Sequence, residues 1–71
     1  MAKDTNLQDQ LEALIDKHGI GRVLDNLSEV CYLKAEHLES NWQDSATAKQ
    51  WTIIGRKCDA VAVAAYDRVA Q

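Results

Sequence analysis

Apolar residues recur at helical spacing in the first segment of the chain. They follow one another at intervals of three or four residues and so lie on one face of a helix: Leu7, Leu11, Leu14 and Ile15. The pattern predicts a first helix over residues 5–18. Thr5 and Gln8 have the spacing of a capping box at its start. At its end, Gly19 can adopt a left-handed conformation while Ile20 folds back against the helix.

Two longer amphipathic segments follow. The second, over residues 21–42, carries a stripe of inward-facing positions: Ile20, Leu24, Leu27, Cys31, Lys34 and Leu38. The third, over residues 45–70, carries a similar stripe: Trp51, Ile54, Cys58, Val61, Ala65 and Val69. Asp44 or Ser45 can cap the third helix. Three helices joined by short loops predict an all-α fold, a single-domain up-down-up bundle spanning residues 1–71 with two long antiparallel helices.

The short second connection also predicts a register. If the chain turns about Asp44 and Ser45, Cys31 lies level with Cys58, and Lys34 lies opposite Gly55. A glycine inside a helix costs roughly 1 kcal/mol relative to alanine, so a packing reason is expected. We predict that Gly55 leaves room for the aliphatic stem of Lys34 or for an indole ring.

Helix length points to a candidate interaction site at the turn. At 1.5 Å per residue the second and third helices are on the order of 33–38 Å long and the first about 20 Å, so the first covers only half of the hairpin. The turn end keeps four large apolar side chains uncovered: Leu38, Trp42, Trp51 and Ile54. A second copy of the chain or another protein is the natural cover. The alternative is that Trp42 and Trp51 stack on one another and close this end themselves.

Four neighbouring residues enlarge the same candidate face. Tyr32 and Leu33 lie off the inward stripe, on the solvent side, and Glu36 and Glu39 form an acidic rim. The expected partner is therefore the chain itself, as a homodimer, or another protein.

Composition and charge narrow the class of protein. The 71 residues contain no proline, and the formal net charge is -3. Proline-free sequence fits long helices, and a mildly acidic chain is not drawn to nucleic acid or to anionic membrane. The first two segments are acidic and the third is basic, which favours their association. No apolar run is long enough for a membrane span and no signal peptide or internal repeat is evident, so we expect a cytoplasmic location.

The residues that commonly carry chemistry form no recognisable site. Cys31 and Cys58 are expected to be buried free thiols, with a disulfide as the alternative, because both would face the core. No cysteine or histidine spacing typical of zinc is present. His18 and His37 are isolated, and His37 has no serine, cysteine or second carboxylate placed to use it as a base. We therefore expect no enzymatic activity, no metal and no cofactor.

The alternative to a helical module that binds proteins is a small nucleic-acid-binding regulator. The first helix, the Gly19–Gly21 turn and the second helix can be read as a helix-turn-helix, with Arg22 at the start of the reading helix. Asp25 and Glu29 would then face phosphate, which disfavours this small nucleic-acid-binding regulator.

Three short strings carry a resemblance to a known family. Leu14-Ile15-Asp16-Lys17-His18-Gly19, Lys34-Ala35-Glu36-His37-Leu38 and Asn41-Trp42-Gln43-Asp44, followed by Ala48 and Trp51, resemble a family of small uncharacterised helical proteins from bacteria and their bacteriophages. The resemblance spans residues 7–58. It implies a bacterial or bacteriophage cytosol and carries over no catalytic residue. Phage-related proteins of this size often modulate a host protein, which by analogy fits a binding role.

Overall fold

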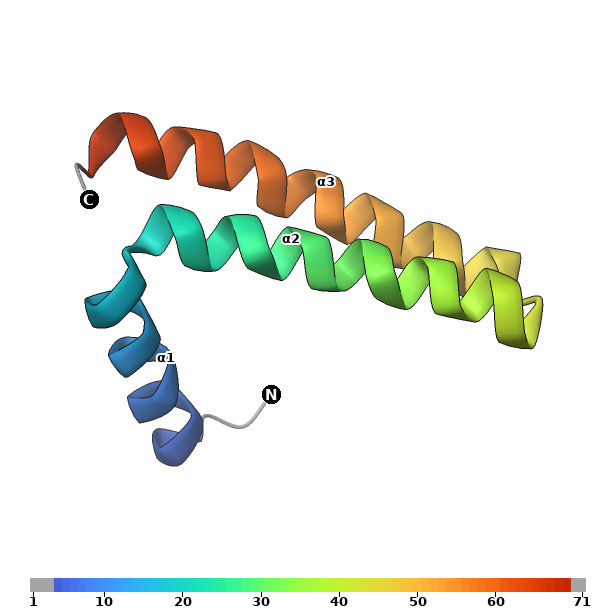
Figure 1. Cartoon of the computed structure of the whole chain (residues 1–71), viewed down its shortest axis with the longest axis horizontal. Helices are drawn as coiled ribbons and strands as arrows, with labels where there is room; N and C mark the ends of the chain where they lie inside the picture. Colours follow the sequence, from blue (N-terminus) through green and yellow to red (C-terminus); the bar gives the residue numbers. More distant parts are fainter. Residues whose placement is uncertain (1–3, 70–71) are drawn as a thin grey trace.

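Three helices account for nearly all of the chain in the computed structural model, which describes residues 4–69 apart from the side chain of Trp42. Helix α1 runs over Thr5–His18, α2 over Ile20–His37 and α3 over Ser45–Arg68, and a π-helical segment, η1, extends α2 over Leu38–Trp42. Helices α2 and α3 lie antiparallel (Figure 1). The predicted all-α class, with a short first helix and two longer ones, is confirmed.

The ends of α1 differ in detail from the expected caps. Asp4, not Thr5, is the N-cap, because its carboxylate accepts a hydrogen bond of 3.1 Å from the backbone N–H of Leu7. At the other end Gly19 alone separates α1 from α2. Its φ of 86° and ψ of 147° are not the expected left-handed helical values. They lie close to a backbone region that is essentially restricted to glycine, so this residue sets the direction in which α1 leaves α2.

The connection between α2 and α3 follows the predicted position. Gln43 has left-handed backbone angles (φ 52°, ψ 36°) and donates its backbone N–H to the Leu38 carbonyl. Asp44 then caps α3, accepting a hydrogen bond of 3.1 Å from the backbone N–H of Thr47. The polar cluster after Trp42 therefore ends one helix and starts the next, as its residue types predict.

Small residues form the seam between α2 and α3. On each helix a small residue recurs every seven positions and is buried: Gly21, Ser28 and Ala35 on α2, and Ala48, Gly55 and Ala62 on α3. Seven residues are close to two helical turns, so each set faces the partner helix along its length. Small side chains let the two helices approach closely.

This seam displaces the stripe predicted for α3. The large residues Ile54 and Val61, expected to face inward, are 47% and 53% exposed. They lie beside the seam because the small residues occupy the line of closest approach. Val69 is likewise exposed.

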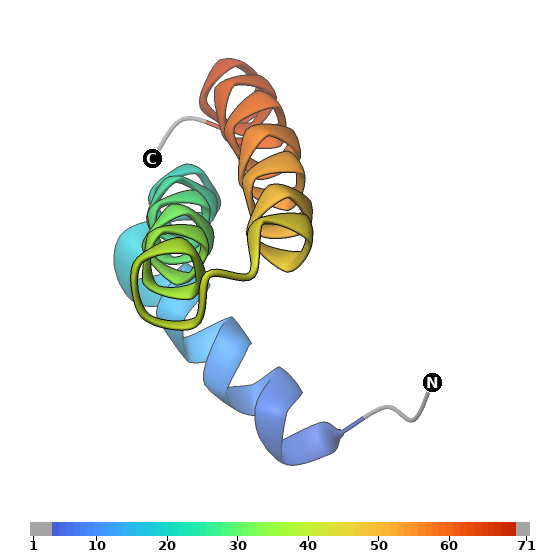
Figure 2. The same cartoon turned by 90° about the vertical axis from the view of Figure 1, so that its right-hand side faces the viewer.

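Helix α1 points away from the hairpin. Within residues 4–69 it packs against α2 and makes no contact with α3, and both views show it leaving at the Gly19 end of α2 (Figures 1 and 2). It therefore does not lie along half of the hairpin, contrary to the prediction from its length. The radius of gyration is 13.9 Å, against about 11 Å for a compact chain of this length.

Candidate functional site

Helices α2 and α3 lie side by side and form a single layer. Large side chains beside the seam of this layer therefore have no further helix of the hairpin to pack against. Four of them are exposed on the side of the hairpin that also carries Leu38 and Trp51: Leu27, Val30, Ile54 and Val61. We refer to these six residues as the apolar face. Trp51, Ile54 and Val61 belong together because intervals of three and seven residues keep them on one side of α3.

A hollow of about 380 Å³ opens in the apolar face near the turn. Residues from both arms of the hairpin line it, among them Val30, Leu33, Leu38 and Trp51. The Lys34 ammonium lies 5.6 Å from the centre of the Trp51 ring, which is a cation–π distance. Lys34 therefore covers part of the half-buried indole with its charge still exposed, rather than occupying the space beside Gly55.

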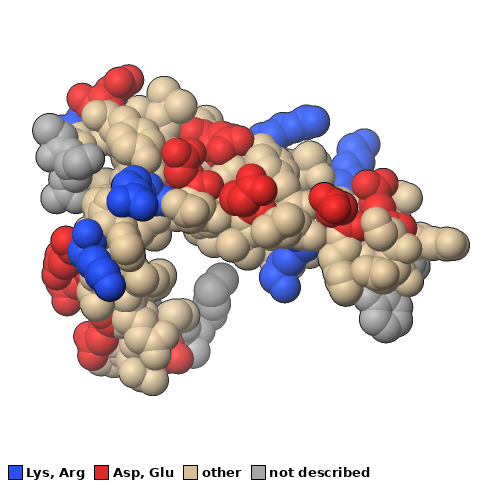
Figure 3. All heavy atoms as spheres, viewed as in Figure 1, with Lys and Arg blue, Asp and Glu red and all other residues tan. Residues whose placement is uncertain are grey.

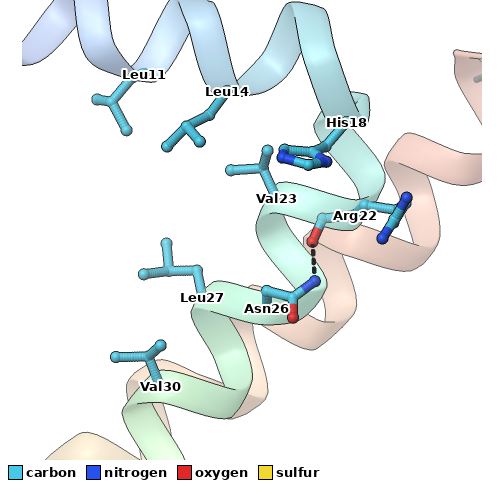
Figure 4. A pocket seen from close by; sticks show the side chains of 8 residues that line it. All are labelled: Leu11, Leu14, His18, Arg22, Val23, Asn26, Leu27 and Val30. Carbon is cyan, nitrogen blue, oxygen red and sulfur yellow. Dashed lines mark hydrogen bonds between the residues drawn. The ribbon is translucent and has the colours of Figure 1, made fainter.

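A second hollow, of about 440 Å³, continues the apolar surface toward α1. Leu11 and Leu14 point from α1 toward Val23 and Leu27 of α2 across an open space (Figure 4). Val30 lines both hollows. The exposed apolar surface thus runs without a break from α1 along α2 to the turn.

Two cysteines lie between the helices. Cys31 and Cys58 are free thiols, Cys31 buried and Cys58 half-buried. Burial raises the pKa of the Cys31 thiol, and the neighbouring Cys58 raises it further by charge repulsion and a hydrogen bond. The two residues are therefore adjacent, as the predicted register places them. A raised pKa keeps Cys31 protonated and weakly nucleophilic.

The opposite side of the hairpin is polar and explains Gly55. A Cβ atom on Gly55 would lie 2.7 Å from Cε1 of Tyr32, so the glycine makes room for a phenol ring. The Tyr32 hydroxyl donates a hydrogen bond of 2.7 Å to the Asp59 carboxylate. The prediction that Gly55 accommodates Lys34 or an indole is wrong, and Tyr32 packs between the helices instead of lying on their solvent side.

The hydroxyl group of the buried residue Ser28 also takes part in this polar contact. Hydrogen bonds from Ser28 and then from Tyr32 lower the pKa of the Asp59 carboxyl, outweighing its partial desolvation. The bond to Asp59 in turn raises the pKa of the Tyr32 phenol. Asp59 therefore stays ionised and ties α2 to α3.

The same arrangement occurs a second time at the far end of the hairpin. A Cβ atom on Gly21 would lie 2.8 Å from the ring of Tyr66, and the Tyr66 hydroxyl lies 3.4 Å from the carboxylate of Asp25. In both cases the aspartate follows the glycine by four residues on one helix and the tyrosine comes from the other.

A sequence repeat that was missed underlies the two arrangements. Residues 20–32 and 54–66 match at five positions: Ile20 with Ile54, Gly21 with Gly55, Arg22 with Arg56, Asp25 with Asp59, and Tyr32 with Tyr66. Because α2 and α3 are antiparallel, an approximate two-fold axis relates the two copies. The shared Ile-Gly-Arg-x-x-Asp string is the signal that could have revealed the packing of both tyrosines.

The structure brings some of the predicted site residues together. Leu33, Leu38 and Trp51 line one hollow, and Ile54 lies on the same side of the hairpin. Tyr32 lies on the other side. The Trp42 side chain lies outside the described part of the structure, so both readings of the indole pair stay predictions.

The remaining candidates are polar and exposed. Glu36 and Glu39 are exposed near the turn. Acidic side chains gather over the middle of the hairpin in the view of Figure 3. His37 is hydrogen-bonded to Asn41, with 2.8 Å between the ring Nδ1 and the amide nitrogen. Arg22, the predicted nucleic-acid reader, lines the hollow between α1 and α2.

Among residues 4–69 no group of three or more histidine, cysteine, aspartate or glutamate side chains is placed to hold a metal ion. Over the same residues, none of the helices combines the length and the apolar character needed to cross a membrane.

Comparison of the chain with protein-family models, with curated proteins and with solved structures found no match. The resemblance to bacterial and bacteriophage proteins therefore stays a prediction, and the geometry of the chain carries the functional argument.

Proposed function

We propose that the protein is a non-enzymatic interaction module that self-associates through the apolar face. The observation that supports this is the amount of surface the chain exposes. Its accessible surface is 5688 Å², whereas a compact chain of this mass exposes roughly 4,400 Å². The excess, about 1,300 Å², exceeds the roughly 800 Å² that each partner contributes to an interface of standard size.

The position of this surplus supports a specific interface. Part of it is contiguous, because Val30, a member of the apolar face, lines both hollows. A patch of this kind on a small protein is typical of an interaction site. Trp51, half-buried under Lys34, supplies an aromatic side chain of the type enriched at binding hot spots.

The test is the solution mass over a concentration series, measured by light scattering or sedimentation. The native chain is expected to approach twice its 7.9 kDa mass as concentration rises. Val61→Asp should shift the equilibrium toward monomer, because it places a charge in the apolar face. Val61 is 53% exposed, so the monomer fold should tolerate the change.

Val63→Asp is the matched control. Val63 lies two residues further along α3, is 64% exposed, and projects from the other side of the helix. The same substitution there should leave the dimer intact. A native chain that stays monomeric at millimolar concentration, or equal effects of the two substitutions, would refute the proposal.

A further inference from the structure

Helix α1 has an apolar stripe that its own chain covers only in part. Leu7, Leu11 and Leu14 are 50%, 43% and 45% exposed, although a helix of this amphipathic pattern normally buries that stripe. Among the elements that the structure describes, the helix packs against α2 alone. A single residue, Gly19, connects it to the rest of the fold.

The apolar face on α3 is uncovered in the same way and has a basic border. Lys57 is exposed and lies three residues after Ile54 and four before Val61, so it flanks both. Arg68 is also exposed and follows Val61 by seven residues, or about two helical turns, so it lies on the same side of α3 as Val61. Helix α3 thus offers an apolar strip with positive charges beside it.

The charge of α1 is opposite to that of the basic border of α3. Helix α1 and its cap carry four acidic side chains, Asp4, Asp9, Glu12 and Asp16, against Lys17. Within one chain α1 and α3 do not touch, so the opposite charges of these two helices do not meet there. A second copy lets them meet, and complementary potentials of this kind favour one partner and one orientation.

We propose that in the self-associated form α1 of each copy packs across the α3 part of the apolar face of the other copy. The exchange is reciprocal, as a two-fold dimer requires. It covers the α1 stripe together with Ile54 and Val61, and it brings acidic α1 near Lys57 and Arg68. This inference rests on the proposed self-association and assigns which surfaces meet.

Charge reversal on the full-length chain tests the exchange. The first variant, Glu12→Lys with Asp16→Lys, makes α1 basic. The second, Lys57→Glu with Arg68→Glu, makes the border of α3 acidic. Each variant alone should dimerise at least about tenfold more weakly than the native chain at low salt, because like charges then face one another. An equimolar mixture should recover near-native affinity, since both α1–α3 contacts in the mixed dimer pair opposite charges.

A matched control separates position from net charge. Lys49→Glu with Arg56→Glu makes the same charge change on α3, but both residues are exposed on the side of the helix away from Ile54 and Val61. Mixing this variant with the α1 variant should not restore affinity. Circular dichroism of each variant at the assay temperature confirms that it is folded.

The outcomes distinguish this inference from the proposed function. A native monomer overturns both. A native dimer that is unaffected by either reversal, or whose two reversed variants fail to rescue one another, overturns the exchange of α1 and leaves self-association standing. Loss in each variant with recovery in the mixture supports the exchange.

Discussion

Replacing Gly55 by alanine gives a direct test of the packing of Tyr32. The new Cβ would lie 2.7 Å from Cε1, 3.0 Å from Cδ1 and 3.1 Å from Cζ of the ring. Distances this short force the ring or the helices to move. The ring is held at its far end by the 2.7 Å hydrogen bond to Asp59, so it has little freedom to turn away.

Two opposing terms set the size of the effect. Alanine is favoured over glycine inside a helix by roughly 1 kcal/mol. Inserting a methyl group into a filled contact typically costs about 1–3 kcal/mol. The expected net result for Gly55→Ala is a loss of about 1 kcal/mol in the free energy of unfolding. For a domain of this size such a loss lowers Tm by about 4–8 °C.

The assay is urea denaturation followed by circular dichroism, on single and double variants. In a Tyr32→Ala background the same glycine substitution should become stabilising by roughly 1 kcal/mol, because only the helix propensity remains. Ala60→Gly, at an exposed position of α3, calibrates that propensity in the same helix. The change of sign between the two backgrounds is the signature of the contact.

The second glycine provides an internal comparison. Tyr66 is 44% exposed and its hydroxyl lies 3.4 Å from Asp25, so its ring can move into solvent more easily than that of Tyr32. Gly21→Ala should therefore cost less than Gly55→Ala. A Gly55→Ala variant that is more stable than the native chain with Tyr32 present would falsify the reasoning.

Further predictions concern pH and the helix ends. The hydrogen bonds that lower the pKa of Asp59 stabilise the fold above its unfolded pKa of about 3.9, and the contribution is lost as pH falls through the lower folded value. Asp59→Asn should flatten the acid side of the stability profile, measured by urea denaturation. The raised pKa of Cys31 acts on the alkaline side: burial penalises the thiolate, so the unfolded chain ionises first and stability falls as pH rises from about 8.5 through the folded value, and Cys31→Ala should flatten this side of the profile. Gly19→Ala should lower stability by about 1–3 kcal/mol because its backbone angles strain any other residue. Asp44→Ala should lower Tm by removing the cap of α3, whereas Ser45→Ala should have little effect.

The local structure of this protein follows from its amino-acid pattern. Spacing of apolar residues placed all three helices, and the polar residues after Trp42 placed the turn and left Asp44 or Ser45 as the cap, of which the structure has Asp44. These features depend on residues close together in the chain, whose preferences are expressed wherever the helix lies. The turn position also fixed the register, which brings Cys31 beside Cys58.

The faces on which those helices meet depend instead on contacts between residues far apart in the chain. Large apolar residues outweigh small ones in a hydrophobic pattern, so Ile54 and Val61 were predicted to face inward. The close approach of two helices instead selects the small residues at seven-residue intervals, and the larger ones are left at the side. The direction of α1 was likewise beyond a periodicity argument, because it depends on two backbone angles at Gly19. The exposed apolar face, and with it the candidate site, results from these two features together.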